Sequence, residues 1–383
     1  MNTPMTQWTS RAMRLVTLVL LAAVLAAGTP SLSGDVAWAQ TNDRSVAPEM
    51  PTTGNVPGDT LGNSSDAEMW RAVRQGIQGD VSIPDKKAGV LVQSEGDNWR
   101  AWRNGPITVS GIWILLGTLA LLALFFAIRG RVRIDAGMSG QIIERFNGIE
   151  RFAHWLTAVS FIVLGLTGLN MLYGRHVLLP VLGPDVFAAI TLGGKYAHNY
   201  LAFGFMLGVV LIFLLWIRDN LPNKYDLYWI GEAGGLFSKG SHPPARKFNA
   251  GQKLIFWAVV LGGLSLSLSG ISLMFPFQFA MFQPTFEAFN SIGFNLPTQL
   301  TPMEEMQLSQ VWHGIVGLIM IAIILAHIYI GTLGMEGAFD AMGSGKVDEN
   351  WAREHHNVWV AELKGEPLPN PDEPHSGAAQ PAE

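Results

Sequence analysis

The chain has 383 residues, of which 49% are hydrophobic and only 14% are Asp, Glu, Lys or Arg. Soluble domains carry about 25% charged residues, so this chain has too few charges to cover a soluble surface. Its net charge of -5 argues against a nucleic-acid partner, and the lack of cysteine excludes disulfides, iron–sulfur clusters, thiolate-bound zinc and covalently attached c-type haem within this chain.

The N-terminus has the pattern of a secretory signal. Arg11 and Arg14 precede an apolar run from Leu15 to Ala27, and Ala37-Trp38-Ala39 has the small-x-small pattern of a signal-peptidase site. We therefore predict a signal peptide over residues 1–39 and a mature chain from Gln40. Retention of the run as an uncleaved anchor is the open alternative.

Residues 40–106 form an extension that is expected to be partly disordered. Up to about residue 66 the sequence is rich in Pro, Gly, Ser and Asn and has no apolar period. Residues 67–105 carry enough apolar and aromatic positions for a small element. Fewer than about 40 residues rarely form a stable core alone, so this element is expected to need a partner surface.

Five apolar segments free of Asp, Glu, Lys and Arg follow. Each has the ~20 residues needed to cross about 30 Å of hydrocarbon, and in lipid such runs satisfy their backbone groups as helices. The predicted transmembrane helices are residues 107–128, 152–173, 196–217, 254–275 and 311–333.

The distribution of Lys and Arg in the loops predicts the orientation. The linker 129–151 and the loop 218–253 carry eleven such residues, whereas the loops on the other side carry only Arg175 and Lys195. The positive-inside rule places the first two loops in the cytoplasm, and the signal peptide gives the same orientation independently. We expect a multi-pass inner-membrane protein with a periplasmic extension and a cytoplasmic, mostly disordered tail over residues 334–383.

Four histidines lie within the apolar segments, where ionisable side chains are rare and usually functional. On the last segment, His313 and His327 are 14 residues apart, so they share one face and are separated by about 21 Å. His154 lies at the depth of His327, and His198 at the depth of His313. A single such histidine can be a structural hydrogen-bond donor, but two facing pairs suit bis-histidine haem b ligation better than they suit zinc.

The predicted fold class is therefore an all-α integral membrane protein: a four-helix dihaem cytochrome b bundle over residues 152–333, plus one additional N-terminal transmembrane helix. Two haems whose axial positions are both filled have no open iron site and would transfer electrons across the bilayer. The remaining histidines are expected to be solvated or interfacial; they are His176, His242, His355, His356 and His375.

Four stretches resemble the gamma (cytochrome b556) subunit of membrane-bound respiratory formate dehydrogenases. They are Glu150-Arg-Phe-Ala-His154-Trp155, Lys195-Tyr-Ala-His198, the loop Phe248-Asn249-Ala250-Gly251-Gln252-Lys253, and His313-Gly314 together with Leu325-Ala326-His327-Ile328-Tyr329. The loop is the more specific signal, because paired histidines are shared with the cytochrome b subunits of nickel–iron hydrogenases.

The resemblance implies that His154 and His327 hold an inner haem and that His198 and His313 hold an outer one. It further implies that a molybdenum or tungsten catalytic alpha subunit oxidises formate, and that an iron–sulfur beta subunit passes the electrons to the outer haem. Quinone is then reduced on the cytoplasmic side, with Asn249 and Gly251 lining its site and Gln252 as a further candidate.

Other interpretations of these features stay open. The quinone loop can be an ordinary helix start, with Asn249 as the cap and Lys253 reaching toward the membrane surface. The whole chain can instead be the cytochrome b subunit of a nickel–iron hydrogenase, or a haem-free membrane anchor or transporter. The extension over residues 67–105 is expected to bind a partner subunit outside the membrane.

Overall fold

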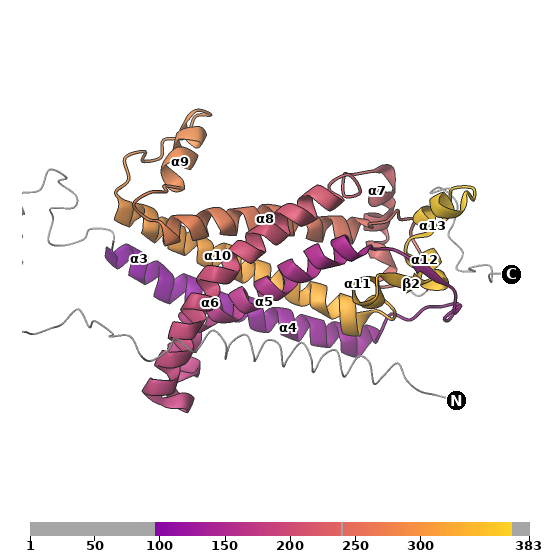
Figure 1. The fold of residues 1–383 in the computed structure, drawn as a ribbon, viewed down its shortest axis with the longest axis horizontal. Helices are drawn as coiled ribbons and strands as arrows, with labels where there is room; N and C mark the ends of the chain where they lie inside the picture. The colour runs from indigo at the N-terminus through magenta and orange to yellow at the C-terminus, as the bar shows by residue number, and fades with distance from the viewer. Residues whose placement is uncertain (1–95, 239, 370–383) are drawn as a thin grey trace, which may run out of the picture. The chain divides into compact units, whose positions relative to one another are not determined.

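The structure is a computed structural model that describes residues 96–238 and 240–369 (Figure 1). The signal peptide, most of the extension and the last residues of the tail lie outside the described residues, so those expectations stay predictions. From Trp99 onward, the described residues belong to one compact unit.

Five long helices dominate this unit and run in alternating directions in Figure 1. Each is long and apolar enough to cross a membrane, which confirms the prediction of an all-α membrane protein with five apolar spans. They are α4 (Thr108–Arg129), α5 (Gly148–Val177), α6 (Leu179–Trp216), α8 (Ala250–Met274) and α10 (Pro302–Tyr329).

The shorter elements lie at the ends of these helices. At one end are α3 (Gly96–Trp102), the π-helical turn η2 (Arg103–Ile107) and α9 (Phe282–Asn290). At the other are α7 (Lys224–Gly231), η3 (Ala233–Gly235), η4 (Ile330–Gly334), α11 (Asp340–Gly343), α12 (Glu349–His355), α13 (Asn357–Lys364), and the antiparallel strands β1 (Ile142–Glu144) and β2 (Lys346–Asp348). We call this second end the polar end.

Three of the long helices begin before the apolar run that predicted them, because a capped polar turn precedes the run. α5 starts at a capping box formed by Asn147 and Glu150, and α10 at one formed by Thr301 and Glu304. Each box satisfies backbone N–H groups that a helix start otherwise leaves without partners. The polar first turns therefore lengthen the helices beyond the charge-free spans.

The prediction of a long loop between the second and third spans is wrong. α5 continues to Val177, and α6 starts at Leu179, well before the predicted residue 196. A sharp bend interrupts α6 at Gly183, whose φ of 75° and ψ of 169° are non-helical, directly before Pro184. Such a backbone suits glycine, which has no Cβ to clash. The chain thus resumes its helix after the bend.

The helices pack in two pairs, α5 along α6 and α8 along α10, and α6 packs on α8 to join the pairs. α4 packs on α10, whereas α5 touches α10 at few points. Small residues allow the close approaches. A Cβ added to Gly208 of α6 would lie 3.1 Å from the backbone of Thr157 in α5. Outward-facing side chains such as Leu166 and Leu254 are more than 60% exposed, as expected for faces that contact lipid.

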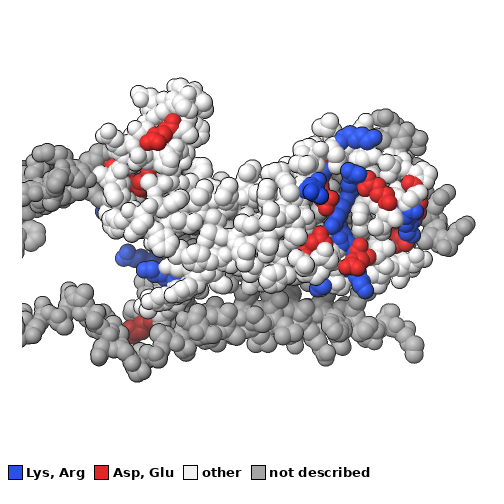
Figure 2. Space-filling model, turned by 45° about the horizontal axis from the view of Figure 1, so that its top comes forward, with Lys and Arg blue, Asp and Glu red and all other residues white. Residues whose placement is uncertain are grey.

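The tail was expected to be mostly disordered, and for residues 334–369 this is wrong. This part of the tail folds back on the polar end, where Trp351, Val347 and Ala352 join a buried cluster with Phe146 and Phe248 from distant segments. Figure 2 shows Lys, Arg, Asp and Glu gathered over this end and a broad middle with almost no charge. The ordered tail therefore closes the polar end of the helix bundle.

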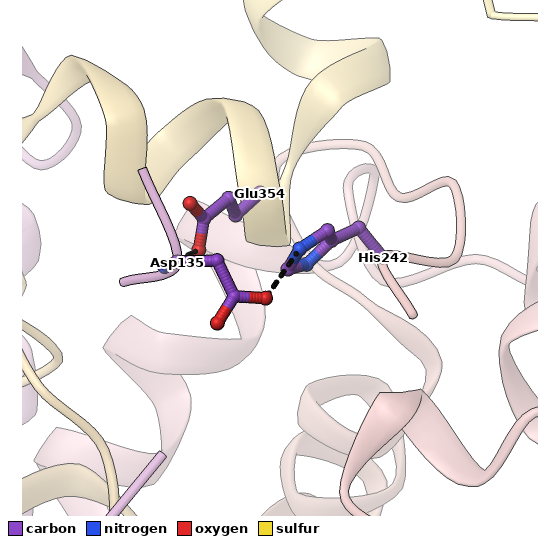
Figure 3. Close-up of side chains that lie close together, drawn as sticks. All are labelled: Asp135, His242 and Glu354. Atoms are coloured by element: carbon purple, nitrogen blue, oxygen red, sulfur yellow. Dashed lines mark hydrogen bonds and ion pairs between the residues drawn. The ribbon is translucent and has the colours of Figure 1, made fainter. Parts of the chain in front are cut away.

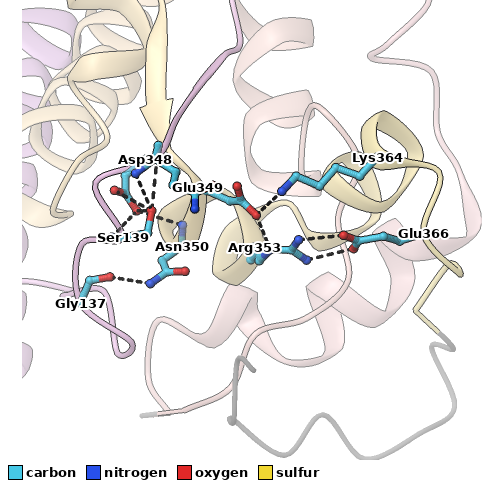
Figure 4. A network of polar contacts seen from close by, with 9 residues as sticks. Gly137, Ser139, Asp348, Glu349, Asn350, Arg353, Lys364 and Glu366 are labelled. Atoms are coloured by element: carbon cyan, nitrogen blue, oxygen red, sulfur yellow. Dashed lines mark hydrogen bonds and ion pairs between the residues drawn. The ribbon is translucent and has the colours of Figure 1, made fainter. Parts of the chain in front are cut away.

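Ion pairs hold the tail in place (Figure 4). The side chain of Glu349 is only 2% exposed and pairs with Arg353 and Lys364, and Arg353 also pairs with Glu366. Asp348 accepts hydrogen bonds from the backbone amides of Ser139 and Asn350 and so joins the linker to the start of α12. This end of the tail is thus fixed by charge as well as by apolar packing.

Candidate functional site

The structure brings the four intramembrane histidines together in two pairs. The ring centroids of His154 in α5 and His327 in α10 are 6.2 Å apart, and those of His198 in α6 and His313 in α10 are also 6.2 Å apart. The rings within each pair are tilted by about 60°. Each pair therefore joins the α5–α6 pair of helices to α10.

The spacing of the rings fits a group held between two nitrogens. Two metal–nitrogen bonds of about 2 Å in line, plus about 1.1 Å from each nitrogen to its ring centre, would give about 6.2 Å between centroids. Neither pair of rings is joined by a hydrogen bond between these described residues. The pairs thus have the separation that two axial ligands of one haem iron require.

Hydroxyl groups set the tautomer of both rings in one pair. The Oγ1 of Thr167 lies 2.8 Å from Nδ1 of His198, and the Oγ of Ser269 lies 2.8 Å from Nδ1 of His313. Each hydroxyl donates its own proton to a backbone carbonyl one turn earlier in its helix, so it accepts from the ring N–H. Nε2 of each ring then keeps the lone pair that binds a metal.

In the second pair, the ring of His154 has no hydroxyl acceptor of this kind among the described residues. Nδ1 of His154 is buried and has no hydrogen-bond partner among the described residues. Its neighbour Trp155 donates from Nε1 to the carbonyl of Met342 in α11, so this pair lies close to the polar end. The two pairs therefore differ in depth and in the polarity around their rings.

The predicted quinone loop forms the start of α8. Asn249 is the N-cap, because its Oδ1 accepts from the backbone N–H of Gln252, whose Oε1 in turn accepts from the N–H of Asn249. The Nδ2 of Asn249 donates to no described residue. A Cβ added to Gly251 would lie 2.7 Å from the ring of Trp229, so the glycine allows that ring to pack closely. Asn249 thus has one side-chain atom engaged in the cap and one available to a ligand.

Lys253 does not extend toward a membrane surface. It is only 5% exposed, and its Nζ contacts Asp226 at 2.8 Å and donates to the carbonyl of Leu221 at 3.0 Å. The lysine therefore joins the start of α8 to α7. This contact fixes the position of α7 beside the candidate quinone loop.

A buried arginine lies behind the same loop, and the sequence analysis did not single it out. Arg145 is 4% exposed and donates to Oε1 of Gln252 and to the carbonyl of Lys247. Its guanidinium lies 5.0 Å from the ring centre of Trp351, and burial lowers its pKa to about 9. It thus links the loop to the folded tail.

The expectation that the loop and tail histidines are solvated or interfacial is wrong for His356 and inaccurate for His355. His356 is 1% exposed and donates from Nδ1 to the carbonyl of Arg246, and burial holds its pKa well below 6.5. Nε2 of His355 is also buried. These positions have a polar sequence with no apolar period, so only the three-dimensional packing shows their burial. His176 is exposed, as expected, and His375 lies outside the described residues.

Five apolar helices that bring intramembrane histidines together in pairs define the class of this protein as an all-α membrane cytochrome b. The profile of the family described as "Prokaryotic cytochrome b561" matches residues 145–345, just over half of the chain. The chain belongs to the prokaryotic cytochrome b561 family, and this family membership implies bound haem b.

Similar proteins include cytochrome b subunits of formate dehydrogenases. The chain is 26% identical over 226 residues to the cytochrome b556(Fdn) subunit of the nitrate-inducible formate dehydrogenase of Escherichia coli (strain K12), an alignment that covers 58% of this chain and 93% of that protein. It is 24% identical over 224 residues to the formate dehydrogenase cytochrome b556 subunit of Haemophilus influenzae, which covers 57% of this chain and 83% of that protein.

Proposed function

We propose that the chain is the cytochrome b subunit of a formate dehydrogenase complex and carries electrons across the membrane to quinone. The likeness to two formate dehydrogenase cytochrome b556 subunits supports the assignment to such a complex. The observation that carries the electron path is the presence of two histidine pairs, each with centroids 6.2 Å apart, at two depths.

In this proposal, His198 and His313 hold an outer haem b through Nε2, and His154 and His327 hold an inner one. Haem b supplies one-electron transfer when bound. Thr167 and Ser269 keep the rings of the outer pair in the required tautomer. With two histidines as ligands, each haem would supply electron transfer and would have no free position for oxygen.

The polar end is the cytoplasmic side in this proposal, because it holds the Lys- and Arg-rich loops. The four-helix bundle over residues 152–333 then crosses the inner membrane with α4 as an additional N-terminal helix. The signal peptide is removed, and the periplasmic extension contacts an iron–sulfur beta subunit that receives electrons from a molybdenum or tungsten alpha subunit.

We place the quinone site at the start of α8, at the polar end. Asn249 donates from Nδ2 to a quinone carbonyl while its Oδ1 keeps the helix cap, and Gly251 lets the Trp229 ring form a wall of the site. Gln252 holds the cap from the other side and is itself positioned by Arg145. Proton uptake for quinone reduction then occurs on the cytoplasmic side.

A haem count and a difference spectrum test the electron path. The chain purified in detergent is expected to contain two b-type haems, and the H198A and H154A variants are expected to contain one each, whereas H176A keeps both because His176 is exposed outside the pairs. A chain without haem would overturn the proposal in favour of a haem-free anchor or transporter. Two haems retained in H198A and H154A would show that these histidines are not the ligands. Adding formate, then hydrogen, to membranes that contain the partner subunits separates a formate dehydrogenase from a hydrogenase subunit.

The quinone assignment is tested separately with N249D. Asp caps a helix about as well as Asn, so the helix start is preserved, but a carboxylate cannot donate to a quinone carbonyl. We expect the haems of N249D to be reduced normally by the donor and reoxidised by quinone at least tenfold more slowly. Reoxidation at the wild-type rate would show that Asn249 acts only as a cap.

A further inference from the structure

Three side chains of types that bind metal ions, from distant segments, meet at the polar end, apart from the paired histidines (Figure 3). They are Asp135 in the linker after α4, His242 in the loop after η3, and Glu354 in α12, and one ligand atom of each lies within 4.8 Å of the others. Nε2 of His242 is 3.2 Å from Oδ2 of Asp135. The three side chains therefore converge on one point.

Glu354 in this cluster has no cationic side chain beside it among the described residues. Glu354 is 2% exposed, and its two oxygens accept from the backbone amides of Asp135 and Ala136. No Lys or Arg among the described residues forms an ion pair with it. Glu349, which is equally buried on the same helix, pairs with both Arg353 and Lys364. Because a buried carboxylate is costly without a cation, Glu354 and Asp135 favour a bound positive charge.

The ring of a second histidine, His355, lies beside that of His242. The ring centroid of His355 is 6.3 Å from that of His242, and its buried Nε2 has no hydrogen-bond partner among the described residues. A buried ring nitrogen without a partner is unusual, and a bound ion or its water would satisfy it.

We propose that Asp135, His242 and Glu354 bind one divalent transition-metal ion of the zinc type. Imidazole nitrogen together with carboxylate oxygen suits zinc, whereas calcium and magnesium prefer oxygen ligands alone. The fourth position is open to water. The ion joins the linker, the loop after η3 and α12, so its role is to fix the folded tail on the bundle.

Metal analysis of the full-length, haem-loaded chain in detergent tests this site. After treatment with EDTA and addition of zinc, gel filtration followed by elemental analysis is expected to show one zinc per chain besides the haem iron. Zinc is also expected to raise the melting temperature of the chain. Calorimetric titration of H242A and D135N is expected to show at least a tenfold loss of zinc affinity.

Both substituted side chains reach solvent, being 16% and 48% exposed, so these variants are expected to fold. H176A, which removes an exposed histidine remote from the polar end, is the matched control and is expected to bind zinc normally. An unchanged haem spectrum in each variant verifies the fold. The proposal is overturned if the wild type retains no zinc, or if the H242A/D135N double variant binds zinc as tightly as the wild type. Neither result depends on the assignment of the quinone site or of the electron donor.

Discussion

Removing the hydroxyl of Thr167 is expected to raise the reduction potential of one haem only. In the proposed assignment, the hydroxyl accepts a hydrogen bond from Nδ1 of His198, an outer haem ligand. An acceptor at Nδ1 makes the imidazole a stronger electron donor and so stabilises the oxidised iron. T167V keeps the shape of the side chain and removes the acceptor, so the oxidised state loses stability relative to the reduced state.

The size of the shift follows from the strength of one hydrogen bond. A neutral hydrogen bond contributes about 0.5–1.5 kcal/mol of net free energy, which corresponds to about 20–65 mV for the transfer of one electron. The hydrogen bond is present in both oxidation states, and only the difference between its strengths in these states shifts the potential. We therefore expect an increase in the lower half of that range.

A spectroelectrochemical titration of the purified chain, fitted with two one-electron steps, measures the shift. S269A removes the equivalent acceptor from His313, the other ligand of the same haem, and is expected to shift the same step in the same direction. T118V is the control, because the Thr118 hydroxyl donates to the carbonyl of Ile114 within α4 and contacts no histidine. A downward shift, or equal shifts of both steps, would refute the reasoning.

Two further predictions concern stability. G208A is expected to lower the melting temperature and the haem content, because its Cβ would be forced against Thr157. Such overpacking costs about 1–3 kcal/mol. G117A is the control: its Cβ would meet nothing within 4 Å, so this variant is expected to be neutral or slightly more stable. E349Q is expected to loosen the folded tail by about 1–2 kcal/mol at neutral pH, measured as faster proteolysis of the tail. Burial raises the pKa of Glu349, but hydrogen bonds from its cationic partners outweigh this and lower the pKa below 4.5. The difference between E349Q and the wild type should thus be complete above about pH 4.5 and shrink as the pH falls below it.

The apolar spans and the pairing of the histidines follow from the sequence because both depend on position along a helix. A charge-free run sets where a membrane span lies, and 14 residues at 1.5 Å each place His313 and His327 on one face at two depths. The early start of α6 was missed because Gly183 and Pro184 are typical of a turn. In the structure they bend the helix without ending it.

The folded tail was not predictable in the same way, because its contacts join residues far apart in the chain. Glu354 accepts from backbone amides more than 200 positions earlier, and Arg145 contacts a loop about 100 positions later. The tail sequence is rich in charge and has no regular apolar period, which is typical of a disordered segment. Its order comes from ion pairs and buried histidines that only the assembled polar end brings together.

The difference between the two histidine pairs suits an inward electron path in the proposed orientation. The pairs are separated by about 21 Å of the roughly 30 Å hydrocarbon core. An electron that moves inward between them against 100 mV of membrane potential therefore loses about 70 mV of driving force. In the proposed assignment, the hydroxyls of Thr167 and Ser269 would lower the potential of the outer haem, together by at most about 130 mV. Because Nδ1 of His154 has no such acceptor among the described residues, this difference would offset part of the driving force that is lost to the field.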